Sequence, residues 1–170
     1  MALNLDQANG GSFAFTAAGV GRGSTATQLK TTNTTPYCVD GIFSASKAAV
    51  ASFALAVPPV TRTDPVTGAS TNVYSYSTIP AGYKAAFSIW LNAAGTPYVT
   101  QGPVAPVGSN ADKVPAGPYP GAGYCLIGVA TLYNATVTAN GGWRPGTDAF
   151  NLAGTTETYF DVFGQAAQSF

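Results

Sequence analysis

Short apolar stretches alternate with turn-forming residues along this chain, and that spacing limits its fold more than any other feature. Twenty glycines and twelve prolines punctuate the 170 residues. The chain lacks the Leu-, Glu- and Lys-rich runs that favour long helices. Thr, Val, Tyr and Phe, which favour strands, are abundant between the breaks. We therefore predict an all-β protein with about eight short strands, folded as a single antiparallel β-sandwich or a small barrel with long Pro/Gly loops.

Strict alternation identifies the clearest strand, residues 83–92, in which every second side chain is apolar or aromatic. A second strand is expected over 124–133 and a closing one over 155–163. Two hairpins are predicted as well. One lies within 34–46 and turns at Asp40-Gly41, a pair typical of type I′ turns, and the other leads from residue 92 into 97–101.

Other stretches carry weaker signals. Residues 46–57 fit a helical turn or a turn followed by a strand, and the alternation after residue 52 favours the strand. Residue pairs that interrupt regular structure, such as Pro58-Pro59 and Asp64-Pro65, predict a loop over 57–69. A strand is expected after it, over 71–79. Residues 102–123 are predicted to form a long loop rich in proline and glycine.

Residues 1–24 differ from the rest, because glycine-rich stretches bracket a single apolar patch, Phe13 to Phe15. Such a segment cannot build a core alone, so we expect an extended N-terminal arm followed by a β-sandwich domain over 25–170; a frayed terminus is the alternative. The first residues have neither the basic nor the apolar region of a secretion signal. No apolar run reaches the roughly 20 residues of a membrane span, so no membrane partner is expected.

Composition argues against several classes of function. The chain has no histidine, so the usual base of a Ser-His-Asp or Cys-His nucleophile is missing. Two cysteines cannot complete a four-ligand zinc shell. Seven basic and seven acidic residues cancel, which disfavours nucleic acid as a partner. We expect no catalytic residues, no metal and no cofactor.

The acidic and sulfur side chains have ordinary structural interpretations. Asp40, Asp64, Asp112 and Asp148 each lie in or beside a predicted turn, where Asp hydrogen-bonds the backbone. Glu157 and Asp161 share a strand face about 13 Å apart, too far for a carboxylate pair. Two further residues, Cys38 and Cys125, lie in predicted strands; buried free thiols are favoured, and a disulfide stays possible.

Aromatic residues outside the best strands are the candidate partner-binding residues. Exposing a large ring to water is unfavourable unless the ring covers a core or a partner. Only 8% of the residues are charged, so few side chains keep the protein surface hydrated. For any one ring, capping the core is the alternative. The candidates are Phe13, Phe15, Tyr119, Trp143 and Phe150.

Several pieces of the sequence, in order and spacing, resemble a group of small virion proteins of tailed bacteriophages. Together they extend over about residues 28–162. The pieces are Lys30 to Asn33, Tyr37 to Phe43, Phe87 to Thr96, Val99 to Gly102, Cys125 to Val129, Pro145 to Asp148, Leu152 to Gly154 and Thr156 to Tyr159. The chain departs from the group between Ala54 and Val73, where it carries an additional Pro-rich loop that could form a contact surface of its own.

The resemblance implies a structural, non-enzymatic role in the virion. The expected role is that of a capsid decoration (cement) protein on the outer capsid surface, with the major capsid protein and further copies of itself, often as a trimer, as its partners. A phage tail or fibre protein that binds host-surface glycans is the main alternative. A carbohydrate-binding module is a third, and an enzyme is the least expected class.

Overall fold

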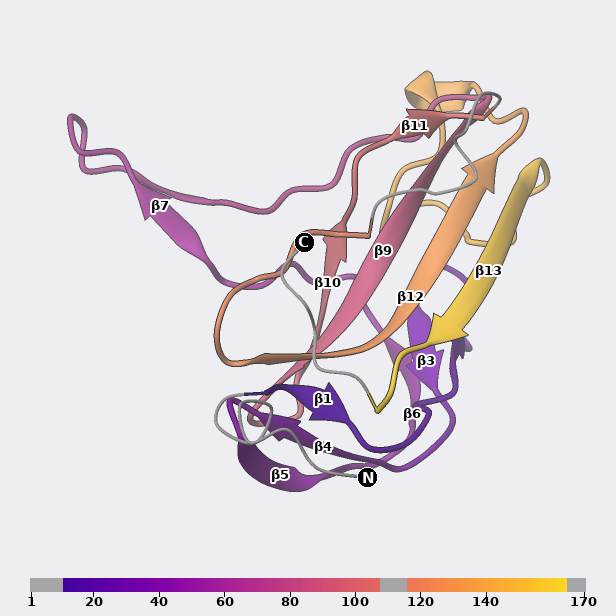
Figure 1. Cartoon of the computed structure of the whole chain (residues 1–170). Coiled ribbons are helices and arrows are strands. Elements are labelled where there is room, and N and C mark those ends of the chain that lie inside the picture. The colour runs from indigo at the N-terminus through magenta and orange to yellow at the C-terminus, as the bar shows by residue number, and fades with distance from the viewer. Residues whose placement is uncertain (1–10, 108–115, 165–170) are drawn as a thin grey trace.

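The computed structural model describes residues 11–107 and 116–164, and strands dominate them (Figure 1). The largest sheet is antiparallel with the order β10-β9-β12-β13, and β11 pairs with the beginning of β9. Its strands are β9 (Tyr83–Asn92), β10 (Pro97–Gln101), β11 (Ala105–Pro106), β12 (Tyr124–Asn134) and β13 (Thr155–Asp161). The strands predicted over 83–92 and 124–133 and the hairpin into 97–101 are therefore confirmed.

Two three-stranded sheets and one separate hairpin complete the strands. The first sheet has the order β1-β4-β5, with β1 (Phe13–Ala14), β4 (Thr35–Val39) and β5 (Ile42–Lys47). The second has the order β2-β3-β6, with β2 (Val20–Arg22), β3 (Leu29–Thr31) and β6 (Val50–Phe53). The hairpin is β7 (Thr61–Thr63) with β8 (Ser70–Asn72), and one short 3-10 turn, η1, covers Ala139–Gly141.

The core lies between the large sheet and the two small ones. On β9 the buried face is formed by Phe87, Ile89 and Leu91. Tyr37 of β4 and Leu29 of β3 belong to the same buried cluster, and β1, β2 and β4 all contact β12. The sheets remain open, so the structure is an all-β sandwich and not a closed barrel.

The second face of β9 is also buried, which its alternating pattern does not predict. Ala86, Ser88 and Trp90 are at most 3% exposed. The long loop before β12 folds back over this face: the ring of Tyr119 lies 5.4 Å from that of Trp90. Of the loop predicted over 102–123, residues 105–106 form β11, and residues 108–115 lie outside the described residues. Residues 116–123 have the irregular backbone that their prolines and glycines predict, and Tyr119 among them covers the sheet.

The predicted N-terminal arm needs correction over its described part. Residues Phe13 and Ala14 pair with β4, and residues 20–22 pair with β3. Ala14 and Ala18 are fully buried in the core. Residues 11–24 are therefore integral to the sandwich, because their small side chains fit under the large sheet; residues 1–10 of the predicted arm lie outside the described residues.

The region around β7 and β8 also differs from its prediction. The loop predicted over 57–69 contains one strand of a hairpin, and the strand predicted over 71–79 ends at Asn72. The side chain of Asn72 stops it: its amide donates to the carbonyl of Pro58 (3.0 Å) and its oxygen accepts from the Tyr74 N–H (2.9 Å). Residues 46–57 contain a strand, as favoured, but it lies earlier than predicted: residues 46–47 end β5, β6 covers Val50–Phe53, and residues 54–57 form no strand.

Candidate interaction surface

An aromatic patch covers the outer face of the sheet β1-β4-β5. Phe13, Cys38 and Phe43 are directly opposed across the three strands and so share one face. Phe15 follows two residues after Phe13 on the same side. Ring centroids lie 4.9 Å apart for Phe13 and Phe15 and 5.7 Å apart for Phe15 and Phe43. We call Phe13, Phe15 and Phe43 the aromatic patch.

The patch is exposed because the turn between β4 and β5 presents it. Asp40 and Gly41 both have positive φ, 51° and 76°, as a type I′ turn requires. Immediately after this turn come Ile42, 72% exposed, and Phe43, 63% exposed. Phe15 is 45% exposed. Three large apolar side chains in open contact with solvent are unfavourable for an isolated domain and favour coverage by a partner.

A projecting hairpin, residues 60–73, is the second exposed element. It extends away from the sandwich, at the far left of Figure 1, and every side chain from 61 to 73 is exposed. At its tip the carboxylate of Asp64 accepts from the N–H groups of Val66 (2.8 Å) and Thr67 (3.3 Å). These hydrogen bonds lower the pKa of Asp64 below its ordinary value. Val66, 91% exposed, is the most exposed large apolar side chain of the described residues.

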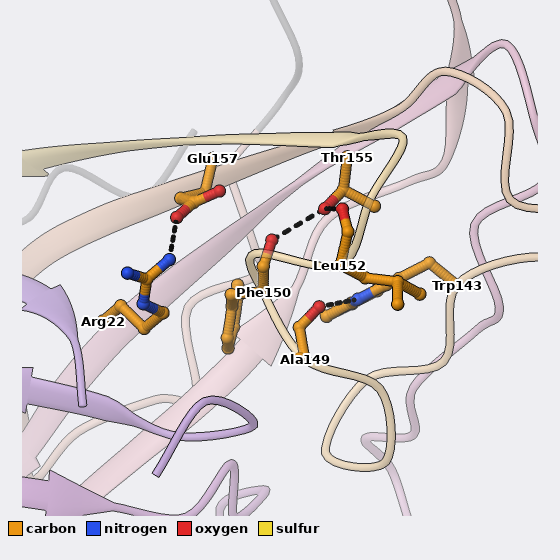
Figure 2. A network of polar contacts seen from close by, with 7 residues as sticks. All are labelled: Arg22, Trp143, Ala149, Phe150, Leu152, Thr155 and Glu157. Carbon is orange, nitrogen blue, oxygen red and sulfur yellow. Dashed lines mark hydrogen bonds and ion pairs between the residues drawn. The ribbon is translucent and has the colours of Figure 1, made fainter. Parts of the chain in front are cut away.

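Trp143 and Phe150 are not available to a partner, which corrects their place among the candidates. Both are fully buried, and their rings pack against Phe87 with centroid distances of 5.9 and 6.2 Å. Figure 2 shows the indole N–H of Trp143 donating to the carbonyl of Ala149 at 2.8 Å. The turn-rich sequence around Trp143 and Phe150 predicts exposed loops. In the fold, these loops turn inward over the end of the large sheet.

Tyr119 has an intermediate place, 37% exposed. One side of its ring covers Trp90, and its carbonyl accepts from the hydroxyl of Tyr74 at 3.0 Å. The neighbouring Thr100 hydroxyl accepts from the indole N–H of Trp90 and donates to the carbonyl of Pro118, both at 2.9 Å. Tyr119 therefore caps the sheet and leaves only part of its ring accessible.

Figure 2 also shows the guanidinium of Arg22 paired with Glu157 at 2.7 Å, which fastens β2 to β13. Asp161, on the same face of β13, accepts from the Val20 N–H at 3.0 Å. Each carboxylate thus has its own partner along the β13 edge. The predicted turn role of Asp148 is also present, since its carboxylate accepts from the Arg144 backbone N–H at 2.7 Å. The Arg144 guanidinium, 3.0 Å away, further lowers the pKa of Asp148.

The carboxylate of Asp40 accepts a hydrogen bond from the Ser12 hydroxyl. Asp112 lies outside the described residues. Within the part of the chain that the structure describes, no three His, Cys, Asp or Glu side chains gather as a metal site would require. Nor does any helix in that part have the length and apolar character to cross a membrane.

The two cysteines are free and buried, the favoured alternative. Cys125 is fully buried, and the lost solvation of its thiolate raises its pKa to about 12. The thiol of Cys38 lies 3.2 Å from the carbonyl of Gly11. A thiol with such a raised pKa is a poor nucleophile, so Cys125 acts as a small core residue.

Of the two rings predicted in this patch from the sequence, Phe15 is exposed and Phe13 is half-buried. The exposed residues Ile42, Phe43 and Val66 were not among the predicted candidates. Ile42 and Phe43 lie within a good strand pattern, which predicts burial of one of them. In the fold Phe43 lies opposite Cys38 on the outer face of the sheet and Ile42 lies opposite Val39 beside the turn, and both are exposed. Comparison with protein-family models, curated proteins and solved structures finds no match for this chain.

Proposed function

We propose that this chain is a structural, non-enzymatic virion protein of a tailed bacteriophage, most specifically a capsid decoration (cement) protein. It binds the outer capsid surface and bridges neighbouring subunits of the major capsid protein. The observation that carries the proposal is the presence of two separate exposed elements, the apolar aromatic patch and the projecting hairpin, in which only Arg62 and Asp64 are charged. The sequence resemblance to small virion proteins supplies the setting.

The mechanism is mechanical. Each square ångström of apolar surface removed from water contributes about 25 cal/mol, so even a small contact at a subunit junction opposes separation of those subunits. The icosahedral or helical symmetry of a virion repeats the contact many times, and the sum raises the barrier to rupture. A low-charge surface suits this role, because burying ion pairs would carry a desolvation cost.

An add-back experiment tests the proposal. Particles of the encoding phage that lack this protein are incubated with the purified chain, and bound copies are counted after sedimentation. We expect saturable binding and a higher temperature of genome release. Tailless, mature capsids serve as the matched control and should bind equally well.

Binding only to tails, or to host-cell glycans in the absence of capsids, would replace the decoration role with the tail or host-recognition alternative. The partly exposed ring of Tyr119 on its aromatic neighbour is the place to test for such glycan contact. Lack of binding to every part of the particle would contradict a virion role.

A further inference from the structure

Three tyrosines from separate segments of the chain meet on the second face of the large sheet, at the end where β10 and β12 begin (Figure 1). Tyr98 and Leu126 are both directly opposite Trp90, so they share its face. Tyr124 lies two residues before Leu126 and therefore on the same side. The rings of Tyr98 and Tyr124 are 5.8 Å apart, edge to face, and Tyr119 covers Trp90. We call Tyr98, Tyr119 and Tyr124 the tyrosine cluster.

The tyrosine cluster is accessible, whereas the aromatic ring beneath it is not. Tyr119 is 37% exposed and the other two tyrosines are half-buried, but Trp90 is only 3% exposed. Solvent therefore meets ring edges and faces that rest on a buried aromatic floor. The face of an aromatic ring carries negative charge density, which attracts polarised C–H groups.

Hydroxyl groups distinguish the tyrosine cluster from an apolar face. Among the described residues, the tyrosine hydroxyls that form hydrogen bonds are those of Tyr37, Tyr74 and Tyr76. The three hydroxyls of the cluster form none within that part of the chain, and each can donate one hydrogen bond and accept others. A ligand that matches this surface presents C–H groups and hydroxyl groups side by side. Sugar rings have that composition.

The segment that carries Tyr119 is fastened before any ligand arrives. The Thr100 hydroxyl donates to the carbonyl of Pro118 at 2.9 Å, and the Tyr74 hydroxyl donates to the carbonyl of Tyr119 at 3.0 Å. Gly117 packs so closely on the Thr100 carbonyl that no side chain fits between them. A ring held in place in this way lowers the ordering cost of binding.

The electrostatics of the cluster favour a neutral ligand over an anionic one. Partial burial raises the pKa of the Tyr119 phenol, and the carboxylate of Asp40 raises it further. Asp40 thus makes a negative charge at this place unfavourable, and the same repulsion acts on an acidic sugar. A neutral sugar hydroxyl meets no such repulsion and can donate to a phenol oxygen.

We propose that the tyrosine cluster binds a short neutral saccharide, with one sugar ring stacked on Tyr119 and sugar hydroxyls bonded to the phenols of Tyr98 and Tyr124. The inference goes beyond the proposed function, because decorating a capsid requires no saccharide. A particle that displays many copies gains a firm hold on a glycan-coated surface even when each site binds weakly.

The available surface suits a saccharide better than a protein. Three fully accessible aromatic side chains present about 450–750 Å² in total, and these three are partly covered. A stable protein interface needs about 800 Å² on each partner. A short saccharide covers a smaller surface and binds with correspondingly modest affinity.

Saturation-transfer NMR with chitotriose, maltotriose and cellotriose tests the proposal, and trigalacturonate is the acidic probe. We expect at least one neutral probe to bind with a Kd of about 1 mM and trigalacturonate to bind at least about tenfold more weakly. Tyr119→Ala should weaken neutral binding by about tenfold or more. Tyr98→Phe keeps the ring and removes one hydrogen bond, so about threefold is expected. Tyr83→Ala is the matched control, also 37% exposed but at the other end of β9, and should bind like the natural chain.

Thermal unfolding verifies that each variant is folded. If Tyr119→Ala does not fold, the double variant Tyr98→Phe/Tyr124→Phe replaces it, because it keeps every ring. Absence of binding to all three neutral probes at about 20 mM contradicts the proposal. So does binding that survives Tyr119→Ala, binding that is lost in Tyr83→Ala, or tighter binding of trigalacturonate.

Add-back to capsids separates this inference from the proposed function. Tyr119→Ala should bind capsids as the natural chain does. A chain that binds capsids through Tyr119 and binds no saccharide would make the cluster a protein interface and overturn the inference. Capsid binding without any saccharide binding leaves the proposed function standing, whereas saccharide binding without capsid binding supports this inference and overturns the proposed function.

Discussion

Truncating Phe150 tests whether the turn-rich segment 143–154 belongs to the core. Its ring is fully buried, with centroids 6.2 Å from Phe87 and 5.2 Å from Trp143. Replacing a buried Phe by Ala costs about 3–5 kcal/mol, since transfer free energy is lost and a cavity remains. Two aromatic contacts of about 0.5–1.5 kcal/mol each vanish as well, so the upper half of that range is expected. This is a large share of a typical unfolding free energy of about 5–15 kcal/mol.

Urea unfolding followed by tryptophan fluorescence measures the effect. With a slope of about 2 kcal/mol per molar urea, Phe150→Ala should lower the midpoint by about 2 M. Phe43→Ala is the matched control: its ring is 63% exposed, so the expected loss is below about 1 kcal/mol. Equal midpoints for Phe150→Ala and the natural chain would refute the assignment of this segment to the core.

Three further predictions follow from the fold. Deleting residues 1–24 should prevent cooperative folding, because it removes β1 and β2, and calorimetry should show no transition; a normal transition would mean that these residues are dispensable. Gly117→Ala should destabilise the chain by more than about 2 kcal/mol, measured by urea unfolding, because the added Cβ would clash with the backbone carbonyl of Thr100. Stability should fall as pH rises from 9 toward 12, because the unfolded chain releases the Cys125 proton near 9.0 while the folded chain holds it to about 12. Cys125→Ala should flatten that slope between about pH 9 and pH 10, before tyrosines titrate, and an unchanged slope would show that another group causes it.

Local pattern predicted the strands well where one physical rule dominates. Residues 83–92 alternate strictly and coincide with β9, and Asp40-Gly41 forms the turn that its backbone preferences indicate. The choice between sandwich and barrel depends on which strands pair over long distances. A single sequence does not encode that choice locally; in the fold, the separate open sheets make the structure a sandwich.

The residues that the sequence misplaced share one cause. Trp143 and Phe150 follow glycines and prolines, which indicate a turn but do not indicate where the turn goes. In the fold, Trp143 forms a two-way backbone bridge with Ile79, 64 residues earlier, and this bridge draws the segment over the core. The sequence did not predict the exposure of Val66 and Phe43 either, because it depends on long-range placement: Val66 lies at the tip of a projecting hairpin, and Phe43 lies on the outer face of its sheet.

The most direct test of the proposed decoration role is a cryo-electron microscopy map of the intact particle. The structure of this chain, with its open sandwich and projecting hairpin, gives a shape that can be fitted to density. We predict that it fits density on the outer capsid surface, over junctions between major capsid subunits, at symmetry-related positions. Density for the chain only at the tail or fibres, or none in a particle that contains every other structural protein, would contradict the proposal.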